Sequence, residues 1–131
     1  MPDLNVEYAY VTSAGGPTPW GTWLTCEETE HVPGMPNVPA TRWHGYVFEV
    51  LPFGPRGAYP QQVRIPGMGR FNREAAAVDP VTSFVYLTED HPEGLFYRFV
   101  PAGYRPWGFG SYLRGGELQA MRIEQLTRWR A

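Results

Sequence analysis

Residues 84–101 read FVYLTEDHPEGLFYRFVP, and this stretch decides the fold. Its aromatic and β-branched residues favour extended backbone, so residues 84–88 and 95–100 are predicted strands. The HPEG sequence at 91–94 predicts a tight turn between them, because Pro and Gly interrupt regular structure. Two strands joined by a tight turn, the second closed by Pro101, predict an antiparallel hairpin.

An earlier segment repeats this pattern. Residues 24–28 (LTCEE) again end a predicted strand in acids, and residues 44–51 (HGYVFEVL) again form an alternating aromatic strand before a proline. The two aromatic strands begin at Gly45 and Gly94, within the spacing of about 40–50 residues that propeller blades use. The sequence therefore predicts an all-β, loop-rich β-propeller segment of about two blades, with residues 1–131 as a single partial propeller domain.

Other short strands are predicted at residues 5–12, 22–26, 62–65, 74–78 and 117–123. The stretch 13–19 (SAGGPTP) is predicted to be a turn, and 103–116 a loop, because both are rich in Gly and Pro. Since a propeller needs at least about four blades, a chain with two is expected to be a fragment or to assemble with further blades or copies of itself.

Composition excludes several classes of protein. The chain has 43% hydrophobic residues, enough for a core, and 15 Gly and 14 Pro, which disfavour long helices. A net charge of −2 with dispersed arginines predicts no nucleic-acid partner. No apolar run is long enough to span a membrane, and the single Cys excludes an intramolecular disulfide. The first residues lack a signal-peptide pattern, which leaves a cytoplasmic location open.

Acidic residues at the predicted strand ends are the candidate metal ligands. Cys26 and Glu27 end one strand, Glu89 and Asp90 end its repeat, and Glu74 opens an alanine-rich strand. Carboxylates suit Ca²⁺, and a thiolate suits iron or zinc. The alternatives are a buried apolar role for Cys26, solvent-facing acids at 89 and 90, and an ion pair of Glu74 with Arg70 or Arg73. His44 is expected to be a packing or hydrogen-bonding group.

Six motifs resemble the PhoX-type alkaline phosphatases, also known as the domain of unknown function 839 group. They are residues 15–28 (GGPTPWGTWLTCEE), 44–50 (HGYVFEV), 69–80 (GRFNREAAAVDP), 85–90 (VYLTED), 95–101 (LFYRFVP) and 115–121 (GGELQAM). The resemblance implies a propeller hydrolase that acts on phosphomonoesters, holds Ca²⁺ and Fe³⁺ in its central channel, and works in the periplasm or after secretion.

By the same resemblance, Cys26 matches an iron ligand and Glu74 a metal ligand, with Glu27, Glu89 and Asp90 as further ligands or their neighbours. Two departures stand out: Arg73 occupies a position where the family often has His, and family members are several times longer than this chain. A chain with only part of the metal cluster is expected to bind metal weakly and to be inactive as a phosphatase on its own. Two other functions stay open. One is a non-catalytic propeller module, truncated or assembling, and the other is a calcium-dependent propeller hydrolase of lactones or phosphotriesters.

Overall fold

The computed structural model describes residues 12–53, 61–103 and 105–123. These residues form eight strands and two short 3-10 helices, η1 (Pro66–Met68) and η2 (Ser111–Arg114). The strands are β1 (Thr12–Pro17), β2 (Trp23–Glu27), β3 (Val47–Leu51), β4 (Gln61–Ile65), β5 (Arg73–Val78), β6 (Val85–Glu89), β7 (Phe96–Pro101) and β8 (Gly116–Ala120). In the described part of the chain, no helix is long and apolar enough to cross a membrane.

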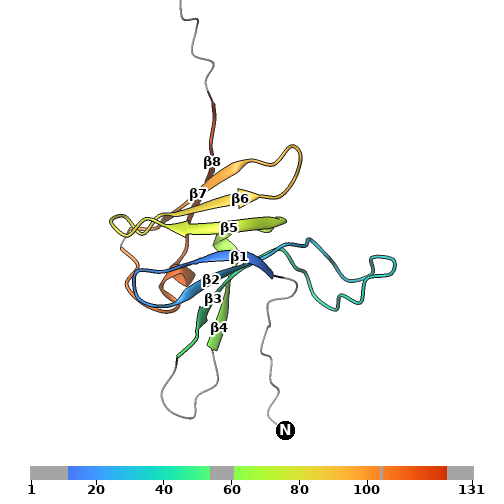
Figure 1. The fold of residues 1–131 in the computed structure, drawn as a ribbon, viewed down its shortest axis with the longest axis horizontal. Helices are drawn as coiled ribbons and strands as arrows, with labels where there is room; N and C mark the ends of the chain where they lie inside the picture. Colours follow the sequence, from blue (N-terminus) through green and yellow to red (C-terminus); the bar gives the residue numbers. More distant parts are fainter. Residues whose placement is uncertain (1–11, 54–60, 104, 124–131) are drawn as a thin grey trace, which may run out of the picture.

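The strands form two antiparallel sheets, each with its four strands in sequence order (Figure 1). The N-terminal sheet contains β1 to β4, and the C-terminal sheet contains β5 to β8. The prediction of an all-β chain is therefore confirmed, and seven of the predicted strands match β2 to β8 to within a few residues at each end. The two sheets pack against each other through β1 and β5 and do not close into a ring. The strand predicted at 5–12 lies outside the described residues except for Thr12.

The turn predicted at residues 13–19 is wrong, because most of this stretch forms β1. A Cβ atom on Gly15 would lie 1.8 Å from the Leu24 carbonyl oxygen, and one on Gly16 would lie 2.0 Å from that of Ala76. The glycines therefore serve close packing of β1 against β2 and β5, not chain reversal. The reversal comes after them, where the Thr18 N–H donates to the Thr22 carbonyl at 2.9 Å.

Both sheets carry the same irregularity between their first two strands. In the N-terminal sheet the register shifts between Thr12, opposite Glu27, and Gly15, opposite Thr25. In the C-terminal sheet it shifts between Arg73, opposite Glu89, and Ala76, opposite Leu87. The shared bulge makes Glu27 equivalent to Glu89 and Cys26 equivalent to Thr88. An alignment of the sequence repeat would match Leu24-Thr25 with Leu87-Thr88, but in the structure Thr25 is equivalent to Leu87, one residue earlier.

The core lies between the sheets. Alternation along each strand points one set of side chains inward, and the fully or almost fully buried ones are Leu24, Cys26, Val47, Ile65, Met68, Ala76, Val85, Leu87, Phe99 and Tyr112. Tyr112 of η2 closes one end, since its ring packs edge-on to Phe99 and its hydroxyl donates to the Ser83 carbonyl at 2.9 Å. The two sheets thus form one packed unit.

Candidate metal centre

All five predicted ligands lie on one rim of the molecule, where β2 and β6 end and β5 begins. The segment 28–46, drawn in cyan, leaves the sheets from this rim in Figure 1. Hydrogen bonds join this segment to the residues that precede β5: Phe71 N–H donates to the Gly45 carbonyl at 2.8 Å, and Asn72 N–H donates to the Glu30 carboxylate at 3.2 Å. The strand ends that carry these acids therefore lie on one side of the two sheets, and metal binding by their side chains stays a prediction.

Cys26 is fully buried and points into the core with Leu24. Burial raises the pKa of the Cys26 thiol to about 11; the positive charge of Arg73 lowers this pKa and the negative charge of Glu74 raises it. Cys26 is therefore buried like an apolar core residue and also has charged neighbours, as a metal ligand would. Without a bound cation the thiol is protonated at neutral pH.

Arg73 is the charged side chain at the centre of this region, and sequence reasoning treated it only as a possible partner of Glu74 and a departure from the family pattern. It is fully buried, donates to the Met68 carbonyl, and lies 4.6 Å from the centre of the Phe71 ring. Burial lowers the pKa of its guanidinium to about 10, against the opposing influence of Cys26, Tyr97 and Glu89. Arg73 is therefore a cation at neutral pH, and its charge interacts with the Cys26 thiol of the N-terminal sheet and the Glu89 carboxylate of the C-terminal sheet.

Glu27 is directed away from Cys26, because successive residues of a strand face opposite sides of the sheet. Its buried carboxylate receives three short hydrogen bonds: from the ring of His44 at 2.9 Å, from Gly45 N–H at 2.6 Å and from Tyr46 N–H at 2.9 Å. Both carboxylate oxygens are engaged in this way. Glu27 therefore anchors the return of segment 28–46 to β3, and the expected hydrogen-bonding role of His44 is confirmed.

The remaining three acids differ in exposure. Glu89 is half-buried and accepts hydrogen bonds from Leu95 N–H at 3.0 Å and from the Tyr97 hydroxyl at 3.2 Å. Burial and the adjacent Glu89 raise the pKa of Tyr97, which keeps its hydroxyl protonated as the donor. Glu74 and Asp90 have exposed side chains. The charges of Arg73 and Glu74 thus both act on the Cys26 thiol, and the charge of Glu89 acts on Arg73.

The side chains on this rim are of the types that bind metals, but too few of the described ones converge to hold an ion. A buried thiolate suits iron and a carboxylate suits calcium, and the Glu74 carboxylate lies close enough to Cys26 to raise the pKa of its thiol. However, within residues 12–53, 61–103 and 105–123, no three His, Cys, Asp or Glu side chains converge as ligands of one ion. A complete site would need ligands from beyond the described residues.

A second buried carboxylate, Glu49, was not among the predicted site residues. It accepts hydrogen bonds from Trp20 Nε1 at 2.8 Å, from the Thr22 hydroxyl at 2.6 Å and, across the sheet interface, from Gly110 N–H at 2.9 Å. The sequence could have indicated its burial, because Glu49 lies two residues after Val47 and so faces the same side of a strand whose inward positions are otherwise apolar. Its three partners make it a structural link between the sheets.

We expect the ionisation of Cys26 in the metal-free folded chain to occur near pH 11, compared with 9.0 for an ordinary thiol. Since the folded state binds this proton more tightly than the unfolded chain, its contribution to stability is complete below pH 9 and is lost as the pH rises through 11. The measurement is thiolate ultraviolet absorbance against pH, with Cys26→Ala subtracted to remove tyrosine ionisation. Titration at or below pH 9 would contradict the buried placement.

These features define an all-β protein made of two repeated four-stranded sheets with ionisable side chains gathered on one rim. A family model described as alkaline phosphatase PhoX matches residues 9–130. The chain belongs to this family, as its motifs predicted. Comparison with curated proteins and with solved structures gave no match.

Proposed function

We propose that this chain forms two blades of a β-propeller phosphomonoesterase and supplies part of its metal site. The observation that carries the proposal is the family match over residues 9–130. The gathering of Cys26, Glu74 and Glu89 on one rim around Arg73 supports it. Membership of this family also favours action on phosphomonoesters in the periplasm or outside the cell.

The propeller architecture is supported by the form of the sheets. Each is a four-stranded antiparallel meander, and the first strands of the two sheets, β1 and β5, lie next to each other (Figure 1). Propellers arrange four-stranded sheets radially around a channel, typically with four to eight blades. Two blades therefore account for only part of a ring, and the rim with Cys26 and Glu74 would face the region where the blades converge.

In this proposal Cys26 is an iron ligand and Glu74 a ligand of iron or calcium. Glu89 and Asp90 lie on the same rim as neighbouring acids, and Glu27 supports the site by holding segment 28–46. Bound ions of this kind polarise a phosphoryl group and offset the charge that develops during its transfer. The chain's own contribution is to exclude water from the thiol and to balance its charge with Arg73.

A non-catalytic module that assembles with other chains is the second candidate, and one observation favours it. The guanidinium of Arg73 influences the Cys26 thiol electrostatically, so it places positive charge where a metal cation would have to bind. If the guanidinium of Arg73 takes the place of a metal cation, Cys26 is only a core residue and this rim binds no metal.

Metal analysis of the purified chain, with phosphatase activity measured on the same samples, tests the proposal. If further blades complete the ligand set, we expect iron and calcium to copurify with the assembly, and Cys26→Ala to reduce iron to the level of the buffer because the thiolate ligand is lost. The exposed Glu93 provides a control, since Glu93→Gln should keep the metal content of the wild type.

The other outcomes distinguish the alternatives. Absence of metal and activity in the wild type, together with iron binding by Arg73→His, would identify a module whose cation site is filled by arginine. Hydrolysis of a lactone or phosphotriester that needs calcium and is unchanged in Cys26→Ala would identify the other class of propeller hydrolase.

A further inference from the structure

The shared bulge shows which faces of the two sheets correspond. The N-terminal sheet packs on the C-terminal sheet through a face that includes Leu24, Val47 and Ile65. Their equivalents in the C-terminal sheet are Tyr86, Phe96 and Met121. Phe96 corresponds to Val47, because Phe96 pairs with Thr88 as Val47 pairs with Cys26. Met121 corresponds to Ile65, because Met121 N–H donates to the Phe96 carbonyl just after β8 as Ile65 pairs with Val47. These equivalents lie on the outward face of the C-terminal sheet, away from the core.

The outward face of the C-terminal sheet is exposed where its counterpart is buried. Phe96 is 38% exposed and its equivalent Val47 is 0% exposed, while Met121 is 52% exposed and Ile65 is 0% exposed. Tyr86 is half-buried, whereas Leu24 is fully buried. Apolar side chains thus occupy interface positions on a face that no other part of the described chain covers to the same degree.

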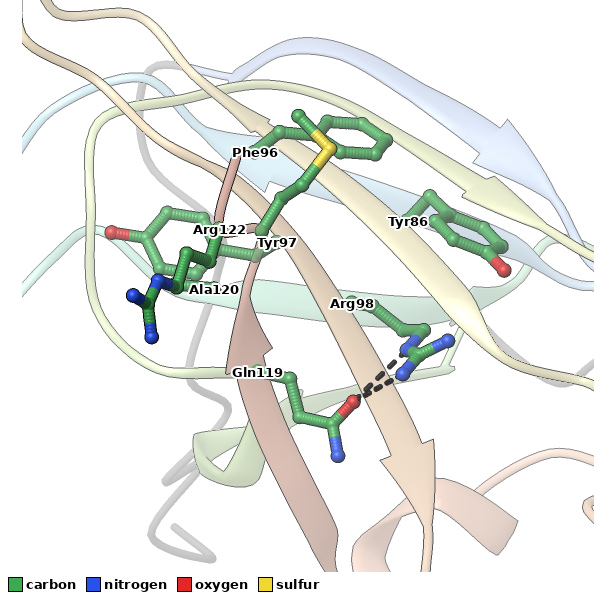
Figure 2. Close-up of a pocket in the computed structure, with 8 residues that line it drawn as sticks. Tyr86, Phe96, Tyr97, Arg98, Gln119, Ala120 and Arg122 are labelled. Atoms are coloured by element: carbon green, nitrogen blue, oxygen red, sulfur yellow. Dashed lines mark hydrogen bonds between the residues drawn. The ribbon is translucent and has the colours of Figure 1, made fainter. Parts of the chain in front are cut away.

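This face also has the chemistry of a protein interface. Figure 2 shows Tyr86, Phe96, Arg98 and Gln119 around a pocket of about 320 Å³. The Tyr86 and Phe96 rings are stacked with centres 6.0 Å apart, and the Arg98 guanidinium donates two hydrogen bonds to the Gln119 side chain, at 3.0 and 2.6 Å. Rigid aromatic rings and an arginine held in one orientation are the groups that dominate binding energy in interfaces.

The outward face of the N-terminal sheet is the matching half. Its Trp23 is 44% exposed, whereas the equivalent Val85 on the inward face of the C-terminal sheet is 0% exposed. Thr25 and Val50 are half-buried where their equivalents, Leu87 and Phe99, are fully buried. This face therefore corresponds to the surface that the C-terminal sheet presents to the N-terminal sheet within one chain.

We propose that the chain assembles head to tail with a second copy of itself: the outward face of the C-terminal sheet of one copy packs on the outward face of the N-terminal sheet of the next. The contact continues, from chain to chain, the interface that already joins the two sheets within each chain. Pairing two C-terminal sheets face to face is disfavoured, because Arg98 and Arg122, which both line the pocket, would meet their own copies. A head-to-tail contact repeats, so it leads to a closed ring when the rotation between copies allows closure.

Sedimentation analysis of the 131-residue chain over the micromolar range tests this assembly. We expect a mass that is a multiple of the 14.9 kDa chain, and its reduction to one chain in both Phe96→Glu and Trp23→Glu. Val81→Glu is the control, because Val81 is an exposed apolar residue in the β5–β6 turn and should leave the mass unchanged. Circular dichroism verifies that each variant is folded, and Met121→Glu replaces Phe96→Glu if the latter is not.

Mixing the two variants decides the geometry. Each retains one intact face, so an equimolar mixture of Phe96→Glu and Trp23→Glu is expected to form a one-to-one pair, although neither associates alone. A wild type of single-chain mass at every concentration overturns the proposal, as does association that survives Phe96→Glu. Loss of association in Phe96→Glu alone, with Trp23→Glu unaffected, would mean that two C-terminal sheets pair with each other, and this also overturns it.

Discussion

Replacing Gly16 with alanine is expected to push the two sheets apart and to lower the free energy of unfolding by about 3 kcal/mol, the upper end of the usual range for overpacking. The added Cβ would lie 2.0 Å from the Ala76 carbonyl oxygen and 3.1 Å from its carbonyl carbon. Both are backbone atoms of β5, so no side-chain rotation relieves the clash. The loss is a large part of the roughly 5–15 kcal/mol that stabilises a typical domain. Urea unfolding followed by tryptophan fluorescence measures it.

Gly108→Ala provides the matched control for this substitution. A Cβ at Gly108 would have no heavy atom within 4 Å, so its unfolding midpoint should stay near that of the wild type or rise slightly through reduced entropy of the unfolded chain. Equal midpoints for Gly16→Ala and Gly108→Ala would contradict the close approach of β1 and β5.

The second large effect is expected for Glu49→Ala, with a loss of about 3–5 kcal/mol. The substitution removes the acceptor of three donors, namely the Trp20 indole, the Thr22 hydroxyl and Gly110 N–H. A buried donor left without an acceptor costs about 1–3 kcal/mol, and Gly110 belongs to the other half of the chain. Loss of this carboxylate should therefore weaken the contact between the sheets as well as the β1–β2 turn.

Glu49→Gln separates the hydrogen bonds from the packing of this side chain. Its amide keeps one accepting oxygen and turns an NH₂ group towards one of the donors, so we expect a loss smaller than that of Glu49→Ala but clearly measurable. Differential scanning calorimetry is the appropriate readout, with the exposed Glu93→Gln as the control. A thermal midpoint in Glu49→Ala equal to that of the control would show that this carboxylate does not link the sheets.

The site was only partly predictable from sequence. Spacing and strand ends located Cys26, Glu74 and Glu89 on one rim, because strands of a repeated hairpin end at equivalent places. The same adjacency placed Glu27 with Cys26, although the pleat directs neighbouring residues to opposite faces. Its three hydrogen bonds to segment 28–46 come from residues whose positions depend on how that segment folds back.

Sequence alone determined the all-β class, seven of the eight strands and the family, since these depend on alternation, turn residues and motifs that are local in the chain. Only the tertiary structure decided that Gly15 and Gly16 belong to a strand, because their role is set by the carbonyl groups of Leu24 and Ala76 that pack against them. It also decided that Arg73 is buried beside the Cys26 thiol. Contacts between the two sheets join residues far apart in the chain, and no local pattern records which atoms meet there.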